Sequence, residues 1–260
     1  MAESRARRPE LSLDRFARGW IAPPLAAETE RLYRSFETSV YPLDDIVVSV
    51  RSRVFLDVIA SARPGSEVVL APCGMVSYAY LSSEANHYLE IDTQSVVDYK
   101  RCRAHRLSTG RLLPTRMVSY QSCDLTDLVA LDSVVANPTR RPRTYILEGI
   151  SYYLREDQWW NFVDHVASLS GPEDVMAFDF WPASDRMASI YERFRQFCMT
   201  EAGLGPTAFN FLDETDIRSF FGSTSVSIVD PSREAHTRFQ ICSLHGSEIL
   251  RDTVAVVGLA

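Results

Sequence analysis

The sequence predicts an α/β fold built around a mostly parallel β-sheet, and three observations support this prediction. Short apolar runs alternate with helical segments between residues 67 and 180, which is typical of βαβ units. Two or three further strands near the C-terminus suit a parallel sheet that ends in an antiparallel edge strand. The chain has 260 residues, of which 46% are apolar, so one large domain can bury a substantial core.

Two helices are expected before the first strand. Residues 26–37 and 43–62 both have helical patterns, and Pro64-Gly65 ends the second. In the second helix Ile46, Val50 and Val54 recur at helical spacing. We expect residues 1–63 to form an N-terminal helical cap and residues 64–260 to form the sheet-containing domain.

Strands and helices then alternate along the rest of the chain. A helix is expected at 155–169 because Trp159, Phe162 and Val166 share one face, and Asp213 is a plausible N-cap for a later short helix. A lid insertion is expected around residues 181–222, which are rich in aromatic side chains. The strands expected for a seven-stranded sheet are 67–71, 87–91, 117–123, 144–149, 175–180, 225–230, 238–244 and 253–259, of which one of the last three is in doubt.

Composition and charge exclude several classes of protein. The formal net charge of -7 argues against non-specific binding to nucleic acid, which needs a clustered basic surface. No apolar run approaches the roughly 18 residues of a membrane helix, and the basic start MAESRARRPE has no apolar stretch behind it. We therefore expect a soluble, cytoplasmic protein without membrane contact, either a monomer or a homodimer.

The cysteines and histidines do not predict a metal site. The five cysteines are widely spaced without a C-x-x-C pair, and the five histidines show no H-x-x-x-H spacing. This pattern fits reduced, mostly buried thiols. Cys73 is expected to be a small loop residue and not a nucleophile, because the sequence places no base or cation beside it.

The chemistry should lie where the strands end, because ligands of open parallel sheets bind outside the carboxyl ends of the strands. Four of the first five strand ends carry an acid. A single acid there is more often a helix N-cap, but caps alone do not explain why four gather on one rim. Such a rim repels phosphate and favours a donor-rich, cationic nucleoside, for which S-adenosylmethionine is the obvious candidate. The strand-end residues are Pro72 and Gly74, then Glu90 and Asp92, Asp124, Glu148, and finally Asp179 and Trp181.

Several motifs in this order resemble those of the leucine carboxyl methyltransferase family. They are SVRSRVFLD before the first strand, EID followed by VVDYK, CDLTD, and above all ILEGISYYLREDQWW. The family includes phosphatase methyltransferases and bacterial polyketide carboxyl O-methyltransferases of the tetracenomycin type. The resemblance covers roughly residues 35–185. It implies a Rossmann-like class I methyltransferase fold with S-adenosylmethionine as cofactor.

The resemblance also implies roles for individual residues. Arg51 matches the arginine that meets the cofactor's carboxylate, and Glu148 matches a glutamate near its amino end. Asp92 matches the acid on the ribose hydroxyls, with Glu90 as the alternative in a shifted register. The other implied cofactor residues are Pro72 and Gly74 in the loop beside the methionine moiety, and Asp124 with Leu125 around adenine.

The predicted substrate pocket lies beyond these residues. Tyr152 and Tyr153, which follow Glu148 in the sequence, are expected to bind the substrate there. Arg53 and Trp181 are further candidates for substrate binding. The loop departs from the family pattern, because Pro72-Cys73-Gly74 stands in place of glycine-alanine-glycine and Val76-Ser77 in place of Asp-Thr. Proline has no amide donor, so the loop must hold its ligand differently in detail.

The leading hypothesis is methyl transfer from S-adenosylmethionine to an oxygen of a small molecule, in bacterial secondary metabolism. A carboxylate acceptor fits best, because it is already ionised and the sequence shows no nucleophile–base pair. A phenol or alcohol would need a base, for which His87 and His105 are weak candidates. One alternative keeps the cofactor for cyclisation or elimination at its methionine chain, or for a pericyclic scaffold role. Another is a non-catalytic binding partner.

Overall fold

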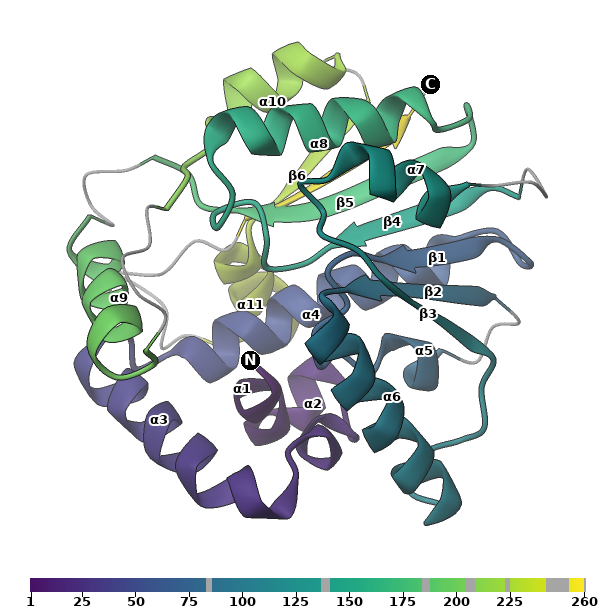
Figure 1. Ribbon diagram of the computed structural model, residues 1–260. Coiled ribbons are helices and arrows are strands. Elements are labelled where there is room, and N and C mark those ends of the chain that lie inside the picture. The colour runs from purple at the N-terminus through teal and green to yellow at the C-terminus, as the bar shows by residue number, and fades with distance from the viewer. Residues whose placement is uncertain are drawn as a thin grey trace.

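The seven described strands form a single sheet in the order β3-β2-β1-β4-β5-β7-β6 (Figure 1). The computed structural model describes residues 1–82, 86–136, 141–183, 188–203, 209–222, 225–241 and 253–259. The strands are β1 (Glu67–Leu70), β2 (His87–Asp92), β3 (Val118–Ser122), β4 (Arg143–Leu147), β5 (Asp174–Phe180), β6 (Val226–Val229) and β7 (Thr253–Leu259).

The predicted fold class is confirmed. Strands β1 to β5 pair in parallel, whereas β7 pairs antiparallel with both β5 and β6. The antiparallel strand therefore lies one place in from the edge, and β6 is the edge strand. The helices that connect and follow the strands are α5 (Tyr78–Leu81), α6 (Gln94–Thr109), α7 (Leu128–Val135), α8 (Glu156–Ser168), α9 (Ala188–Thr200), α10 (Glu214–Phe221) and α11 (Pro231–Phe239).

The strand predicted at 238–244 is wrong at its start, because Arg238 and Phe239 end helix α11. Pro231 occupies the first turn and Asp230 accepts a hydrogen bond from the Ser232 amide, which together start a helix. Residues 242–244 of that predicted strand lie outside the described residues. The N-cap predicted for α10 is confirmed, since Asp213 accepts a hydrogen bond from the Thr215 amide.

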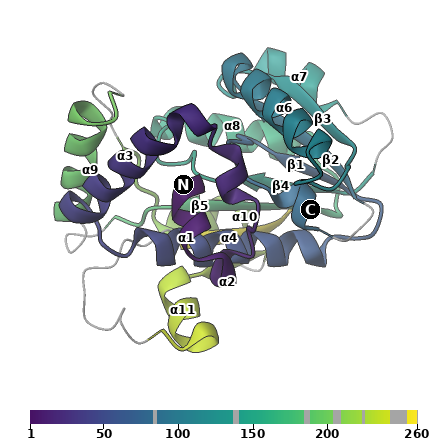
Figure 2. The same ribbon diagram turned by 90° about the horizontal axis from the view of Figure 1, so that it is seen from below.

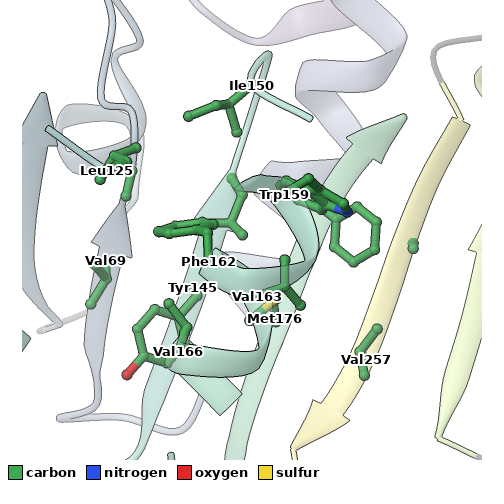
Figure 3. Close-up of a cluster of buried hydrophobic side chains, with 14 of the residues drawn as sticks. Val69, Leu125, Tyr145, Ile150, Trp159, Phe162, Val163, Val166, Met176 and Val257 are labelled. Carbon is green, nitrogen blue, oxygen red and sulfur yellow. The ribbon is translucent and has the colours of Figure 1, made fainter. Parts of the chain in front are cut away.

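Apolar side chains cover both faces of the sheet, and successive residues of a strand serve opposite faces. Val69 faces the layer of α7, α8 and α10, whereas its neighbour Val68 faces the layer that includes α4 and α6. On the first face Trp159 and Phe162 of α8 are buried against Tyr145 and Met176 of the sheet (Figure 3). The sheet is thus a central layer between two helical layers (Figure 1).

The N-terminal helices lie near the carboxyl ends of the parallel strands (Figures 1 and 2). The helices expected at 26–37 and 43–62 are α3 and α4, and α4 buries Phe55 and Ile59 against the sheet. Helices α1 and α2 pack on α4, and α3 packs beside α9. These N-terminal elements are α1 (Ala2–Arg7), α2 (Pro9–Ser12), the short 3₁₀ turns η1 (Ala17–Trp20) and η2 (Pro23–Leu25), α3 (Ala26–Ser39) and α4 (Asp44–Ser61).

The division into a cap of residues 1–63 and a second domain stays a prediction, as does the lid at 181–222. Parts of that lid, residues 184–187 and 204–208, lie outside the described residues. Within the described ranges, no helix is long and apolar enough to cross a membrane.

Candidate cofactor and substrate site

The loop after β1 is held to β2 by its backbone. The Cys73 amide donates to the Ile91 carbonyl at 2.8 Å, and the Gly74 amide donates to Asp92 Oδ2 at 2.9 Å. Gly74 has φ +39°, and a Cβ built there would meet no described atom within 4 Å. Any other residue would therefore strain the backbone and project a side chain into the open space beside the loop.

A buried ion pair lies beneath this loop. Lys100 Nζ is 2.8 Å from Glu90 Oε2, both side chains are fully buried, and the same ammonium donates to the Cys73 carbonyl at 3.0 Å. Burial raises the pKa of Glu90 even though Lys100 opposes the shift. Glu90 therefore supports the loop from below, while Asp92 is the β2 acid that lines the cavity above it.

That cavity, here called the loop cavity, has a volume of about 300 Å³. It brings together predicted residues from three strand ends, namely Pro72 and Gly74, Asp92, and Glu148. Tyr152 and Tyr153 also line it. The remaining lining residues are Met1, Arg5, Cys73, Met75, Val76 and Gly149.

A buried charge cluster borders the loop cavity. Arg51 Nη1 is 2.8 Å from Asp179 Oδ2, and Arg51 Nη2 is 3.0 Å from Glu148 Oε1. Tyr78 donates to Glu148 Oε2 at 2.5 Å. Burial would raise the pKa of Glu148, but the guanidinium groups of Arg51 and Arg5 outweigh it and hold that pKa below its usual value. Glu148 is therefore a permanent anion at neutral pH.

A second cavity of about 340 Å³, the aromatic cavity, opens beside the first. Trp181 stacks on Tyr152 with ring centroids 4.1 Å apart and on Tyr191 at 4.9 Å. The two cavities share Met1, Tyr152 and Tyr153. The aromatic cavity is lined by Met1, Ala2, Glu3, Ser4, Thr29, Leu32, Tyr33, Phe36, Val40, Asp44, Val48, Arg51, Tyr152, Tyr153, Trp181, Ile190, Phe194, Phe197, Cys198 and Ala202.

Besides Glu90 beneath the loop, three predicted site residues lie apart from both cavities. Arg53 pairs with Asp57 at 3.2 Å and lines a separate groove beside α2. Asp124 is exposed and accepts hydrogen bonds from the Thr126 amide and hydroxyl in a turn, whereas the N-cap of α7 is Asp127, which accepts from the Ala130 amide. Leu125 is buried in the core. Asp124 and Leu125 follow β3, whose end lies beside the Asp92 end of β2.

Sequence reasoning missed the contribution of the N-terminal helices. Arg5 lines the loop cavity, and Tyr33, Phe36 and Asp44 line the aromatic cavity. No local pattern marks these residues, because their position depends on how α1 packs on α4 and how α3 packs against α1 and α9. Asp179 was recognised as a strand-end acid, but its pairing with Arg51 depends on two elements far apart in sequence.

We expect Cys73 to be unreactive in the folded protein. Burial raises the pKa of its thiol to about 12, so almost no thiolate exists near neutral pH. Iodoacetamide at about pH 8 should label the exposed Cys102 but leave the Cys73 peptide unmodified, as measured by peptide mass spectrometry. Unfolding in urea should make the two labelling rates similar. Native-state labelling of Cys73 at the rate of Cys102 would contradict the buried position.

The residues that line the loop cavity fit a nucleoside that carries positive charge. Each Asp92 oxygen accepts one backbone amide, so each retains a lone pair for a ribose hydroxyl. Glu148 is anionic and suits an ammonium or sulfonium group. Gly74 leaves open space for close approach to the backbone. Arg5, 1% exposed, has one nitrogen, Nη1, without a hydrogen bond to any described residue.

Comparison with solved structures supports the fold assignment. A DUF574 family protein from Streptomyces avermitilis aligns with a TM-score of 0.63 and 13% identity, over 92% of this chain and 91% of that one. Magnesium protoporphyrin IX methyltransferase from Synechocystis, solved with bound S-adenosylhomocysteine, aligns at 0.50 and 15% identity, over 89% and 94%. An O-methyltransferase family protein from Burkholderia thailandensis aligns at 0.50 and 13% identity, over 100% and 72%. No curated protein matches the sequence.

The sequence itself matches the leucine carboxyl methyltransferase family over residues 11–167, which is more than half of the chain. The match includes Arg51, the loop after β1, Asp92 and Glu148. Taken with the fold and the two adjoining cavities, this match identifies the chain as an S-adenosylmethionine-dependent methyltransferase of the leucine carboxyl methyltransferase family.

Proposed function

We propose that this enzyme transfers a methyl group to an oxygen, most simply a carboxylate oxygen, of a small apolar acceptor. The observation that carries the proposal is that the loop cavity and the aromatic cavity adjoin and share Tyr152 and Tyr153. A methyl donor in the first cavity would face an acceptor in the second. The aromatic cavity, at about 340 Å³, is in the size range of pockets for small organic molecules.

The chain's contribution to this reaction is binding, alignment and exclusion of water. The bound cofactor supplies an electrophilic methyl group on a sulfonium ion. Glu148 provides a negative charge near that cation, and Asp92 orients the nucleoside. The stacked rings of Tyr152 and Trp181 remove water from the acceptor oxygen, which raises its reactivity.

The lining favours an acceptor that is already ionised. No histidine is among the described residues that line either cavity. Asp179 and Glu148 are engaged with Arg51. The two acids that line the aromatic cavity are also bonded, Glu3 to Arg18 and Asp44 to Ser4, so none of these four carboxylates is placed as a general base. A carboxylate needs no base, in contrast to a phenol or an alcohol. We extend the proposal to aromatic acceptors of bacterial secondary metabolism, the tetracenomycin-type subgroup, because seven of the twenty residues that line the aromatic cavity have aromatic rings.

Product analysis tests this proposal. Incubation with S-adenosylmethionine and a panel of aromatic carboxylic acids should give S-adenosylhomocysteine together with a methyl ester, both measured by mass spectrometry. Methylthioadenosine as the product would instead indicate attack on the methionine chain. Asp92→Ala should lower turnover and weaken S-adenosylhomocysteine binding by about 10- to 100-fold, the cost of one or two lost hydrogen bonds to a charged group. The matched control is Asp98→Ala, because Asp98 is exposed and, among the described residues, pairs with Gln94 and Arg101 of its own helix α6.

A further inference from the structure

The aromatic cavity contains a buried carboxylate on α1 that the proposed reaction does not use. We propose that this residue, Glu3, binds a hydroxyl group of the acceptor, so that the enzyme acts on hydroxylated aromatic carboxylic acids and holds them in one orientation. The proposal rests on the proposed function above and narrows its acceptor to one chemical class.

Glu3 is buried, and only one of its two carboxylate oxygens is engaged. The residue is 6% exposed and lines the aromatic cavity. Its Oε1 accepts a hydrogen bond from Arg18 Nη2 at 2.8 Å and lies 3.4 Å from Arg7 Nε. Its Oε2 makes no hydrogen bond to a described residue. An unpaired carboxylate oxygen in the wall of a cavity can accept a hydrogen bond from a donor group of the ligand.

A second unpaired polar group lies close to Glu3. Tyr33 of α3 lines the same cavity, is also 6% exposed, and its hydroxyl makes no hydrogen bond to a described residue. Arg7 lies between the two residues, because its guanidinium is 4.0 Å from the centre of the Tyr33 ring and its Nε faces Glu3. Buried polar groups without partners are costly, so both favour a ligand that supplies hydrogen bonds.

The arginines around Glu3 favour a neutral donor over a cation. Arg7 and Arg18 both face Glu3, and Arg7 also pairs with Glu30 at 2.8 Å. Because two cations already lie beside these two anions, an ammonium group of the ligand would gain little from Glu3. A hydroxyl group brings no charge, and its O–H group forms a short and strong hydrogen bond with a carboxylate.

Repulsion between like charges determines which end of the acceptor meets Glu3. Glu3 and Asp44 both line the aromatic cavity, so a reacting carboxylate is repelled from that part of the wall. The stacked rings of Tyr152 and Trp181 carry no charge, and Tyr152 also lines the loop cavity. The acceptor carboxylate should therefore lie toward these rings and the cofactor, with the hydroxyl group toward Glu3.

Cinnamic acids test the need for a donor directly. The set consists of cinnamic acid, its ortho, meta and para hydroxy derivatives, and the matching methoxy acids, which keep the oxygen but lack the donor. By calorimetry with S-adenosylhomocysteine present, the wild type should bind at least one hydroxy acid about 10- to 100-fold more tightly than cinnamic acid and the matching methoxy acid. The kcat/KM for formation of the methyl ester should follow the same order.

The variant Glu3→Gln should remove this preference and leave the affinity for cinnamic acid unchanged. Its amide oxygen stays with Arg18, so an NH₂ group, which can only donate, takes the place of Oε2. Arg18→Met is the matched control, because it removes a 70% exposed partner of Glu3 and keeps Oε2. This control should retain the preference for the hydroxy acid.

A wild type that binds the hydroxy and methoxy acids equally would refute the role of Glu3 and leave the proposed reaction standing. Weaker binding of every acid alike in Glu3→Gln would show that Glu3 only supports the cavity wall. Loss of the preference in Arg18→Met as well would assign it to the ion pair and not to Oε2. A wild type that neither binds nor methylates any of these acids would instead refute the proposed acceptor class.

Discussion

Replacing Arg51 with methionine is expected to lower the free energy of unfolding by about 3–5 kcal/mol, the usual cost of removing one partner from a buried ion pair. Arg51 is 1% exposed and is the shared partner of Glu148 and Asp179. The variant leaves both acids buried with less compensation, so each must protonate or rearrange. Urea unfolding followed by circular dichroism measures this change.

Arg53→Met is the matched control, because Arg53 lies two residues along the same helix. Its partner Asp57 is about two-fifths exposed, and such pairs contribute about 0–1 kcal/mol. Similar losses in the two variants would mean that the change reflects helix α4 in general. A loss below about 1 kcal/mol for Arg51→Met would contradict the buried cluster.

The pH dependence of the stability of Arg51→Met gives an independent check. The pKa of Glu148 is held below its ordinary value of 4.5 by Arg51 and Arg5, against the opposing effect of burial. A lowered folded pKa contributes stability that is present above 4.5 and lost as the pH falls through the folded pKa. In Arg51→Met this contribution shrinks, so acid unfolding should begin at a higher pH than in the wild type.

The sequence predicted the sheet and the gathering of several strand-end residues at one edge, because both depend on local patterns. Alternating apolar runs predict strands wherever they occur, and parallel strands bring their carboxyl ends to one edge. Gly74, Asp92 and Glu148 therefore come together in the structure as residues of neighbouring strand ends. The pattern was misleading at 238–239, where a proline and an N-cap aspartate favoured a helix over the apolar strand signal.

The rest of the site depends on packing between distant segments. The family resemblance assigned Arg51 to the carboxylate of the cofactor. Nothing near Arg51 in the sequence shows that Asp179, 128 residues later, is its partner. Arg5 stands in a short basic segment that resembles a solvent-exposed start, yet it is among the most buried side chains. Neither position could be inferred before the packing of α4 against β5 and of α1 on α4 was known.

Lys100→Met is expected to have a second large effect, of about 3–5 kcal/mol near neutral pH. Lys100, the chain's single lysine, is fully buried with Glu90, and its ammonium also lies 5.5 Å from the centre of the Trp20 ring. The variant leaves the Glu90 carboxylate without its counter-ion and the Cys73 carbonyl without its donor. Unfolding by urea at about pH 8 measures the loss.

The sign of the pH effect is opposite to that at Glu148. Burial already raises the pKa of Glu90, and loss of Lys100 raises it further. A raised folded pKa contributes stability that is complete below the ordinary value of 4.5 and lost as the pH rises through the folded pKa. The deficit of Lys100→Met should therefore shrink between about pH 8 and pH 5. A deficit that does not change with pH would contradict this account.

The double variant Lys100→Met/Glu90→Gln separates the charge from the loop contact. Glutamine keeps the shape of Glu90 without its charge, so most of the lost stability should return and the pH dependence should disappear. The Cys73 carbonyl still lacks its donor, a loss of about 1 kcal/mol. Because this carbonyl adjoins Gly74, whose amide binds Asp92, the loop should remain looser and S-adenosylhomocysteine should bind more weakly than in the wild type. Recovery of stability without recovery of affinity would assign the ion pair to the fold and the Cys73 contact to the site.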